Sequence, residues 1–187
     1  MPPKVKIKKE DIINTALALV REGGANALNV RAIAAALGCS TQPIFSNFTS
    51  MEVLQNEVVA AAFACYFSFL EKEASSGQYP PYKAYGMAYI RFAKEEKELF
   101  KLLFMRDRTG EIDMPTPDVE QSVQMIMAAN NLSEEKAKLM HLEMWSVVHG
   151  IGVMLATSYL PLDWSLVSDI LSDVYQGLRQ RHGEVKV

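Results

Sequence analysis

Residues 29–48 read NVRAIAAALGCSTQPIFSNF, and this stretch decides the fold. It predicts two short helices joined by a tight turn. Asn29 is a favourable N-terminal cap, and Gly38 stands where a helix ends in a left-handed residue. Pro43 suits the first turn of the second helix, where its missing N–H costs little. A short second helix with an exposed polar edge is the helix-turn-helix layout, in which that helix enters the DNA major groove.

Both helices have one apolar face. The anchors expected for the second helix are Ile44, Phe45 and Phe48, and Ser40 or Thr41 is expected to cap it. The remaining polar side chains then point outward. An ordinary pair of antiparallel helices inside a bundle is the alternative reading of the same pattern.

The flanking sequence favours the DNA-binding reading. A helix is expected from about Lys8 to Glu22, and Thr49 with Glu52 forms a capping box for the next helix. Small, apolar and helix-capping residues succeed one another in a definite order along residues 12–24, 30–40 and 44–54. In the order of these residue types, the first fifty-five residues or so resemble the N-terminal domain of TetR-family transcriptional regulators.

Two departures from that family affect contacts with DNA phosphates. The family usually carries Tyr where this chain has Phe45, and Lys where it has Met51. No Lys or Arg occurs between Arg31 and Lys72, so phosphate neutralisation depends on Arg31 and the N-terminal lysines. Neutral polar groups can bond base edges. The DNA-binding residues predicted from the resemblance and from this chemistry are Lys6, Lys8, Arg31, Ser40, Thr41, Gln42, Phe45, Ser46, Asn47 and Thr49.

Charge is unevenly distributed along the 187 residues. Net charge is −3, but residues 1–50 hold six basic side chains against three acidic ones, and the remainder holds thirteen against nineteen. A DNA-binding head on an acidic body has this asymmetry, and so does a solvated lysine tail. No run of eighteen apolar residues or secretory signal is seen, so a cytoplasmic protein without a membrane span is expected. Cys39 and Cys65 are expected to be packing residues.

The rest of the chain is predicted to be helical, giving an all-α protein of about nine helices. The expected helices cover about 50–75, a segment from Tyr82 through Phe104, 117–130, 133–159 and 163–181. Residues 88–104, together with Trp145, His149 and Gly150, resemble a subgroup of TetR-family C-terminal domains known by its Trp-His-Gly signature. The expected domains are a helix-turn-helix head, 1–48, and a ligand-binding and dimerisation body, 49–187.

The last two helices are expected to pair with their copies in a homodimer. In the last one, apolar residues recur at coiled-coil spacing: Val167, Ile170, Leu171, Val174 and Leu178. The resemblance implies two heads on a palindromic operator. The alternative is that these stripes only close the core of the monomer.

The body is rich in methionine and aromatic residues, which suits a site for a small apolar effector. The residues predicted to line it are Phe63, Phe67, Tyr89, Phe92, Phe104, Met105, Met125, Met144 and Trp145; plain core packing is the alternative. No catalytic motif, cofactor motif or metal-ligand spacing is seen, and His149 is expected to make a packing hydrogen bond. The sequence thus predicts a repressor that releases double-stranded DNA on binding the effector. The alternative is a ligand-binding or scaffold dimer whose head has lost DNA binding.

Overall fold

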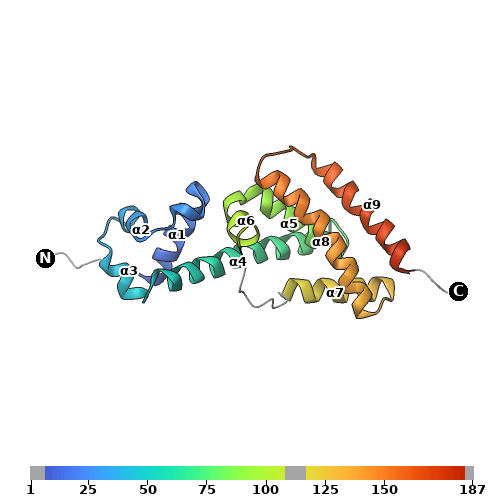
Figure 1. Ribbon diagram of the computed structural model, residues 1–187, viewed down its shortest axis with the longest axis horizontal. Coiled ribbons are helices and arrows are strands. Elements are labelled where there is room, and N and C mark those ends of the chain that lie inside the picture. Colours follow the sequence, from blue (N-terminus) through green and yellow to red (C-terminus); the bar gives the residue numbers. More distant parts are fainter. Residues whose placement is uncertain (1–6, 108–116, 184–187) are drawn as a thin grey trace. The chain divides into compact units, whose positions relative to one another are not determined.

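The computed structural model describes residues 7–107 and 117–183, and within these ranges the secondary structure is helical throughout, as predicted. The elements are α1 (Lys9–Gly23), the short 3-10 helix η1 (Ala25–Ala27), α2 (Val30–Ala36), α3 (Gln42–Asn47), α4 (Met51–Ser75), α5 (Pro81–Glu95), α6 (Lys97–Phe104), α7 (Pro117–Asn130), α8 (Glu134–Ala156) and α9 (Trp164–Gly183). Figure 1 labels α1 to α9 along the chain.

Local sequence signals account for most helix ends. The Asn29 side chain accepts a hydrogen bond from the Ala32 N–H at 2.9 Å, and Ser133 accepts one from the Lys136 N–H at 3.5 Å. Gly38 has a φ of +63°, the left-handed conformation that glycine adopts without steric cost. These three predicted helix ends are confirmed.

Two predicted caps are wrong. The Thr41 side chain makes no capping hydrogen bond, although α3 begins directly after it. At the start of α4 the cap is Ser50, whose hydroxyl accepts from the Val53 N–H at 3.2 Å, and not Thr49. The helix begins at Met51, so Ser50 is the residue whose side chain reaches the N–H groups of the first turn.

The described residues form two compact units. The first contains α1 to α3, α4 as far as Phe67, and α6; the second contains α4 from Ser68, α5 and α7 to α9. The chain passes between the units within α4, between α5 and α6, and after Arg106. The domain division expected from the sequence, 1–48 and 49–187, stays a prediction.

The first unit has an apolar core to which α1, α2, α3, α4 and α6 all contribute. Its largest fully buried side chains include Ile12, Ile33, Ile44, Leu54 and Phe100. The inclusion of α6 is fixed at its start, where Glu96 interrupts the helical run and accepts two hydrogen bonds from Arg21 of α1, at 2.8 and 3.0 Å. A bidentate pair of this kind holds both planar groups in one orientation.

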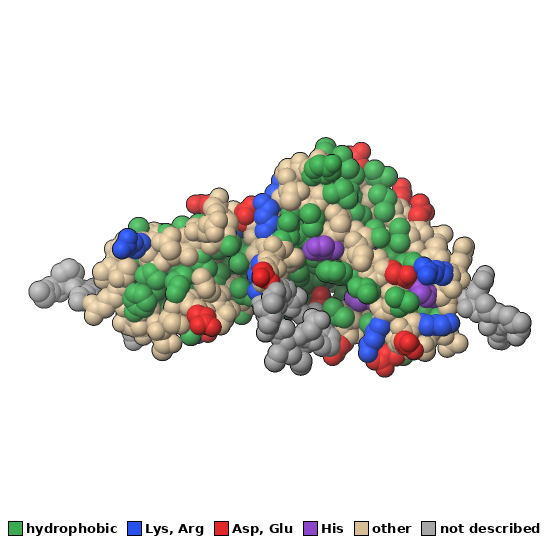
Figure 2. Space-filling model, in the orientation of Figure 1, with side chains coloured by type: hydrophobic (Ala, Val, Ile, Leu, Met, Phe, Trp, Pro, Cys, Tyr) green, Lys and Arg blue, Asp and Glu red, His purple; other side chains and the backbone are tan. Residues whose placement is uncertain are grey.

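The second unit packs α5 against α8, with α7 and α9 alongside. Its core includes Met87, Ile90, Phe92, Ile126 and Met140, all fully buried. On the face drawn in Figure 2, hydrophobic side chains also gather over α8 and α9. Some of the apolar surface of these helices is therefore left outside the core of the unit.

An ion pair and a cation–π contact tie three segments of the second unit together. Arg91 of α5 donates to the buried carboxylate of Glu73 on α4 at 2.9 Å. The Arg91 guanidinium carbon also lies 4.4 Å from the ring centroid of Trp164, the first residue of α9. A buried carboxylate requires such a partner, because an unpaired charge is costly to remove from water.

Helices α4 and α8 are each long and apolar enough to cross a membrane by length and composition alone. Core helices of soluble proteins meet the same test. Both helices here contribute to cores: Leu54 and Val58 of α4, and Met140 and Ile151 of α8, are buried. Of the apolar eighteen-residue stretch in each helix, 28% is buried in α4 and 39% in α8, so burial accounts for only part of their apolar composition.

Candidate nucleic-acid interface

Helix α3 is held to the first unit by one face and exposes the other. Ile44 and Phe48 are four positions apart, so they point the same way, and both are buried. Phe45 is 54% exposed, although the sequence predicts it as a third anchor. That prediction is wrong because one step along a helix turns a side chain by about 100°, which carries Phe45 out of the anchoring face.

The polar residues predicted to contact base edges lie on or beside this exposed face. Gln42, Ser46 and Asn47 are exposed, and Thr41 is half-buried. The Ser46 hydroxyl donates to the carbonyl of Gln42 at 2.9 Å, and the Asn47 amide donates to the carbonyl of Pro43 at 2.8 Å. These two bonds lie inside α3, and the Asn47 amide also donates to the Ile7 carbonyl at 3.5 Å. Thr41 and Gln42, in contrast, make no side-chain hydrogen bond among the described residues. Direct readout by these residues stays a prediction.

The positive side chains of the first unit are partly neutralised from within. Lys9 pairs with Glu57 of α4, and Arg21 pairs with Glu96. In the described part of the chain, exposed Lys8 and Arg31 form no ion pair. Of the remaining residues predicted to contact DNA, Ser40 and Thr49 are exposed, and Lys6 lies outside the described residues.

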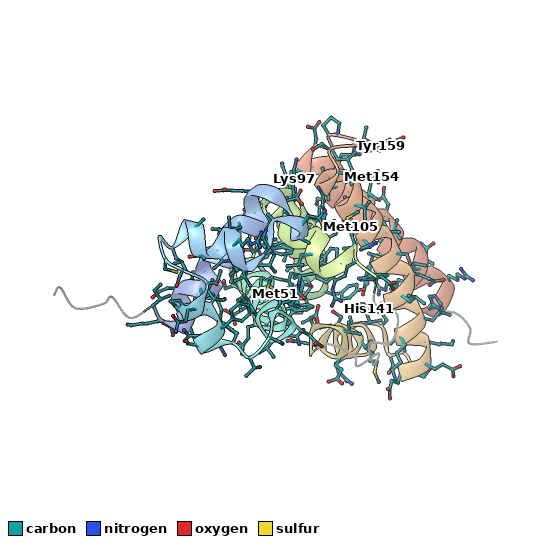
Figure 3. All side chains as sticks on the ribbon, turned by 60° about the vertical axis from the view of Figure 1, so that its left-hand side comes forward. Met51, Lys97, Met105, His141, Met154 and Tyr159 are labelled. Atoms are coloured by element: carbon teal, nitrogen blue, oxygen red, sulfur yellow. The ribbon has the colours of Figure 1, made fainter. Side chains whose placement is uncertain are left out.

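Met51 stands at the first position of α4, close after the end of α3, and is labelled in Figure 3. It is half-buried and carries no charge. The two positions at which the sequence lacks a phosphate-binding group, Phe45 and Met51, therefore stand at the middle of α3 and at the start of α4. Neither side chain carries a positive charge, so neither can contribute to the sequence-independent affinity that comes from neutralising phosphates.

In the second unit, two histidine–tyrosine pairs link α5 with α8. The Tyr89 hydroxyl lies 2.8 Å from His149 Nδ1, which confirms the packing hydrogen bond predicted for His149. The Tyr82 hydroxyl lies 3.1 Å from His141 Nδ1. Burial lowers the pKa of both histidines and raises the pKa of both tyrosines, so both pairs are neutral at neutral pH.

The residues predicted to line an effector site are divided between the units. Phe63, Phe67, Phe104 and Met105 belong to the first unit, where Phe104 lies edge-on to Phe63 at 6.1 Å between ring centroids. The other five belong to the second unit: Tyr89, Phe92, Met125, Met144 and Trp145. Which of the nine contact an effector stays a prediction.

Within the second unit, Trp145 and Tyr89 meet at His149. The Trp145 ring stacks on the His149 imidazole at 4.8 Å between centroids, with 19° between the planes. Phe92 instead packs edge-on against Phe69 at 5.4 Å. The structure therefore joins two of the five predicted residues in one aromatic group and places a third in separate packing.

Two family models match the chain. The model described as bacterial regulatory proteins of the tetR family matches residues 12–58, which cover the helix-turn-helix and its flanking helices. The model described as tetracyclin repressor-like, C-terminal domain, matches residues 82–173. The chain belongs to the TetR family of transcriptional regulators. The second match includes Trp145, His149 and Gly150, on which the resemblance of the C-terminal part rests.

Solved structures share the fold of this chain at low sequence identity. A TetR-like transcriptional regulator from Rhodococcus sp. RHA1 is 12% identical, with 98% of this chain and 100% of that chain covered and a TM-score of 0.67. A TetR variant from Acinetobacter baumannii AYE in complex with minocycline is 14% identical, with 95% and 99% covered and a TM-score of 0.61. A protein of unknown function from the same Rhodococcus strain is 17% identical, with 98% and 100% covered and a TM-score of 0.73. A comparison with curated proteins found no match.

Sequence reasoning missed two features of this TetR-family head. The Arg21–Glu96 pair joins residues 75 positions apart, and no local pattern could have indicated it. The exposure of Phe45 could have been found by placing α3 on a helical projection. Of the three expected anchors, only Ile44 and Phe48 have the four-residue spacing that puts two side chains on one face. The first feature joins α1 to the residue before α6, and the second puts an aromatic ring on the exposed face of α3.

Proposed function

We propose that this TetR-family regulator is a homodimeric cytoplasmic repressor that releases its operator when a small hydrophobic molecule binds its second unit. The observation that carries the DNA-binding part is the division of α3 into two faces. Ile44 and Phe48 fix the helix to the core, and Gln42 and Phe45 are left exposed. A helix presented in this way can enter the major groove, because its outer face is free of the protein.

Exposed apolar side chains on α8 and α9 support the homodimer. Leu139, Leu142 and Trp145 recur at three-residue intervals on α8 and are 40–56% exposed, and Leu166 of α9 is exposed as well. Large apolar residues at helical spacing on a surface are typical of protein interfaces. In the α9 stripe, only Val167 and Leu171 are buried within the chain, so the other three residues retain surface for a partner.

The effector part of the proposal rests on the composition and charge of the second unit. Met144 and Phe92 are buried, Trp145 stacks on His149, and the Tyr89–His149 pair is neutral. An uncharged aromatic setting favours an apolar ligand with few polar groups. One solved structure with this fold, the Acinetobacter baumannii TetR variant, is a complex with minocycline.

Effector binding is proposed to release the operator by changing the distance between the two helix-turn-helix heads of the dimer. Two α3 helices must reach major grooves roughly 34–36 Å apart. Helix α5 ends at Glu95, directly before Glu96, whose carboxylate holds Arg21 of α1. A displacement of α5 by a ligand would therefore act on α1 through covalently adjacent residues, and a shift of a few ångströms would spoil simultaneous contact.

The test measures head separation and DNA binding together. Spin labels are placed at the exposed position 26 by Asn26→Cys in a background of Cys39→Ser and Cys65→Ser, and distances are recorded with and without hydrophobic molecules extracted from the purified protein. The expected result is a changed distance together with weaker binding to the DNA upstream of the gene. An unchanged distance in a ligand-saturated dimer contradicts the mechanism.

A scaffold or ligand-binding dimer without DNA binding is the second candidate. The observation in its favour is the scarcity of unpaired positive charge in the described part of the first unit, where Lys9 and Arg21 are both paired. A salt titration with the upstream DNA separates the two functions. Specific binding with a shallow salt dependence supports the repressor, and no binding even at low salt supports the scaffold.

A further inference from the structure

We infer that Phe45 reads the 5-methyl group of a thymine in the operator, so that part of the sequence preference is apolar. This inference rests on the proposed DNA binding. Its starting point is the position of Phe45, a 54% exposed aromatic ring in α3, the helix proposed to enter the groove. Ile44, directly before Phe45, and Phe48, three positions after it, are buried and hold the helix in place.

The neighbours of Phe45 on α3 place it within the proposed reading surface. Gln42 lies three positions before Phe45, and Thr41 lies four positions before it, so both are adjacent to it on the helix surface. Gln42 is exposed and Thr41 half-buried. Side chains three or four residues apart on one helix can contact neighbouring base pairs, so these three residues form one continuous surface toward the groove.

The chemistry of the ring selects its target. A phenyl group neither donates nor accepts a hydrogen bond, so it cannot bond a phosphate oxygen or a polar base edge. The 5-methyl of thymine is the apolar group on the major-groove edges of the bases, and phenylalanine is among the side chains suited to contact it. Contact there would also remove from water a ring that is exposed in the free protein.

Two other polar side chains of α3, Ser46 and Asn47, are less available for base contacts because they make hydrogen bonds within the helix. The Ser46 hydroxyl and the Asn47 amide donate to the carbonyls of Gln42 and Pro43. Phosphate contacts are limited too, because Lys9 is paired with Glu57. A larger share of the discrimination must then come from Gln42, Thr41 and Phe45.

The experiment removes the methyl and the ring separately. Duplexes that bind the full-length protein are selected from a random library at 50 mM salt, and each thymine is replaced in turn by deoxyuridine, which lacks only the methyl. Affinities are measured for wild type, for Phe45→Ala, and for Val53→Ala as a matched loss of an exposed apolar side chain on α4. Circular dichroism confirms that the variants are folded.

Replacing one particular thymine in each half-site by deoxyuridine should lower the affinity of the wild-type protein for the duplex about fourfold. This is the effect of burying one methyl-sized group. Phe45→Ala abolishes that difference, and Val53→Ala keeps it. The inference is overturned if no thymine is sensitive in the wild type, or if the sensitivity persists in Phe45→Ala. Failure to enrich any duplex overturns the proposed DNA binding and this inference with it, whereas bound duplexes without methyl dependence overturn the inference alone.

Discussion

Replacing Met51 by lysine should convert a shallow salt dependence of DNA binding into a steeper one. Met51 is half-buried at the first position of α4, and the aliphatic stem of lysine can occupy the same space while its ammonium reaches water. The family carries lysine at this position, which favours a phosphate contact there. One new contact in each head of a dimer makes two per operator.

The size of the effect follows from counterion release. Each phosphate contact changes the slope of log affinity against log salt by about −0.9, so two contacts add about −1.8. The affinity advantage of Met51→Lys over the wild type should then shrink about sevenfold between 0.1 and 0.3 M salt. In the described first unit Lys9 and Arg21 are ion-paired, which leaves few cations such as Lys8 and Arg31 to bind phosphates, so the wild-type slope should itself be small.

The assay is fluorescence anisotropy on one labelled duplex over a range of salt concentrations. Val53→Lys is the matched control, because it adds the same charge two residues along α4, about 200° around the helix. Its slope should stay at the wild-type value. Parallel slopes for Met51→Lys and the wild type, or equal steepening by Val53→Lys, would refute the assignment of position 51 to a phosphate contact.

Three further predictions concern stability and assembly. Ile44→Ala should lower the free energy of unfolding by roughly 2–5 kcal/mol in urea titrations, because it empties a fully buried site, whereas Phe45→Ala should change it by less than about 0.5 kcal/mol. Burial lowers the pKa of His149 in the folded protein, so the unfolded chain binds the proton first; stability should fall as the pH drops below about 6.5, and His149→Gln should reduce that slope. Leu142→Glu should shift the dimer to monomer in sedimentation velocity, whereas Val53→Glu should not.

Helix ends set by short-range chemistry could be predicted from the sequence. Asn29 and Ser133 cap helices as expected, and Gly38 adopts the left-handed conformation expected after α2. The helix predicted over residues 117–130 coincides with α7. These features depend on a few neighbouring residues, so the local sequence contains the information that determines them.

Features that depend on exact register or on distant partners could not be predicted. Thr49 and Ser50 are both good caps, and only the starting residue of α4 decides that Ser50 makes the bond. The seam predicted in α9 is shared between the core and the surface, because Val167 and Leu171 are already buried within one chain. For the candidate site, the sequence indicated that α3 would present polar residues. It could not indicate that the Ser46 and Asn47 side chains donate to carbonyls of the same helix, because this depends on their side-chain conformations.

Hydroxyl-radical footprinting of the full-length protein on the DNA upstream of its gene tests most directly whether paired α3 helices read an operator. A dimer that reads an operator with both α3 helices should protect two segments on one face of the duplex, centred about one helical turn or a multiple of it apart. Both segments should disappear in Leu142→Glu, which is expected to be monomeric. If the wild-type protein protects no segment at 50 mM salt, paired α3 helices do not read an operator in this DNA.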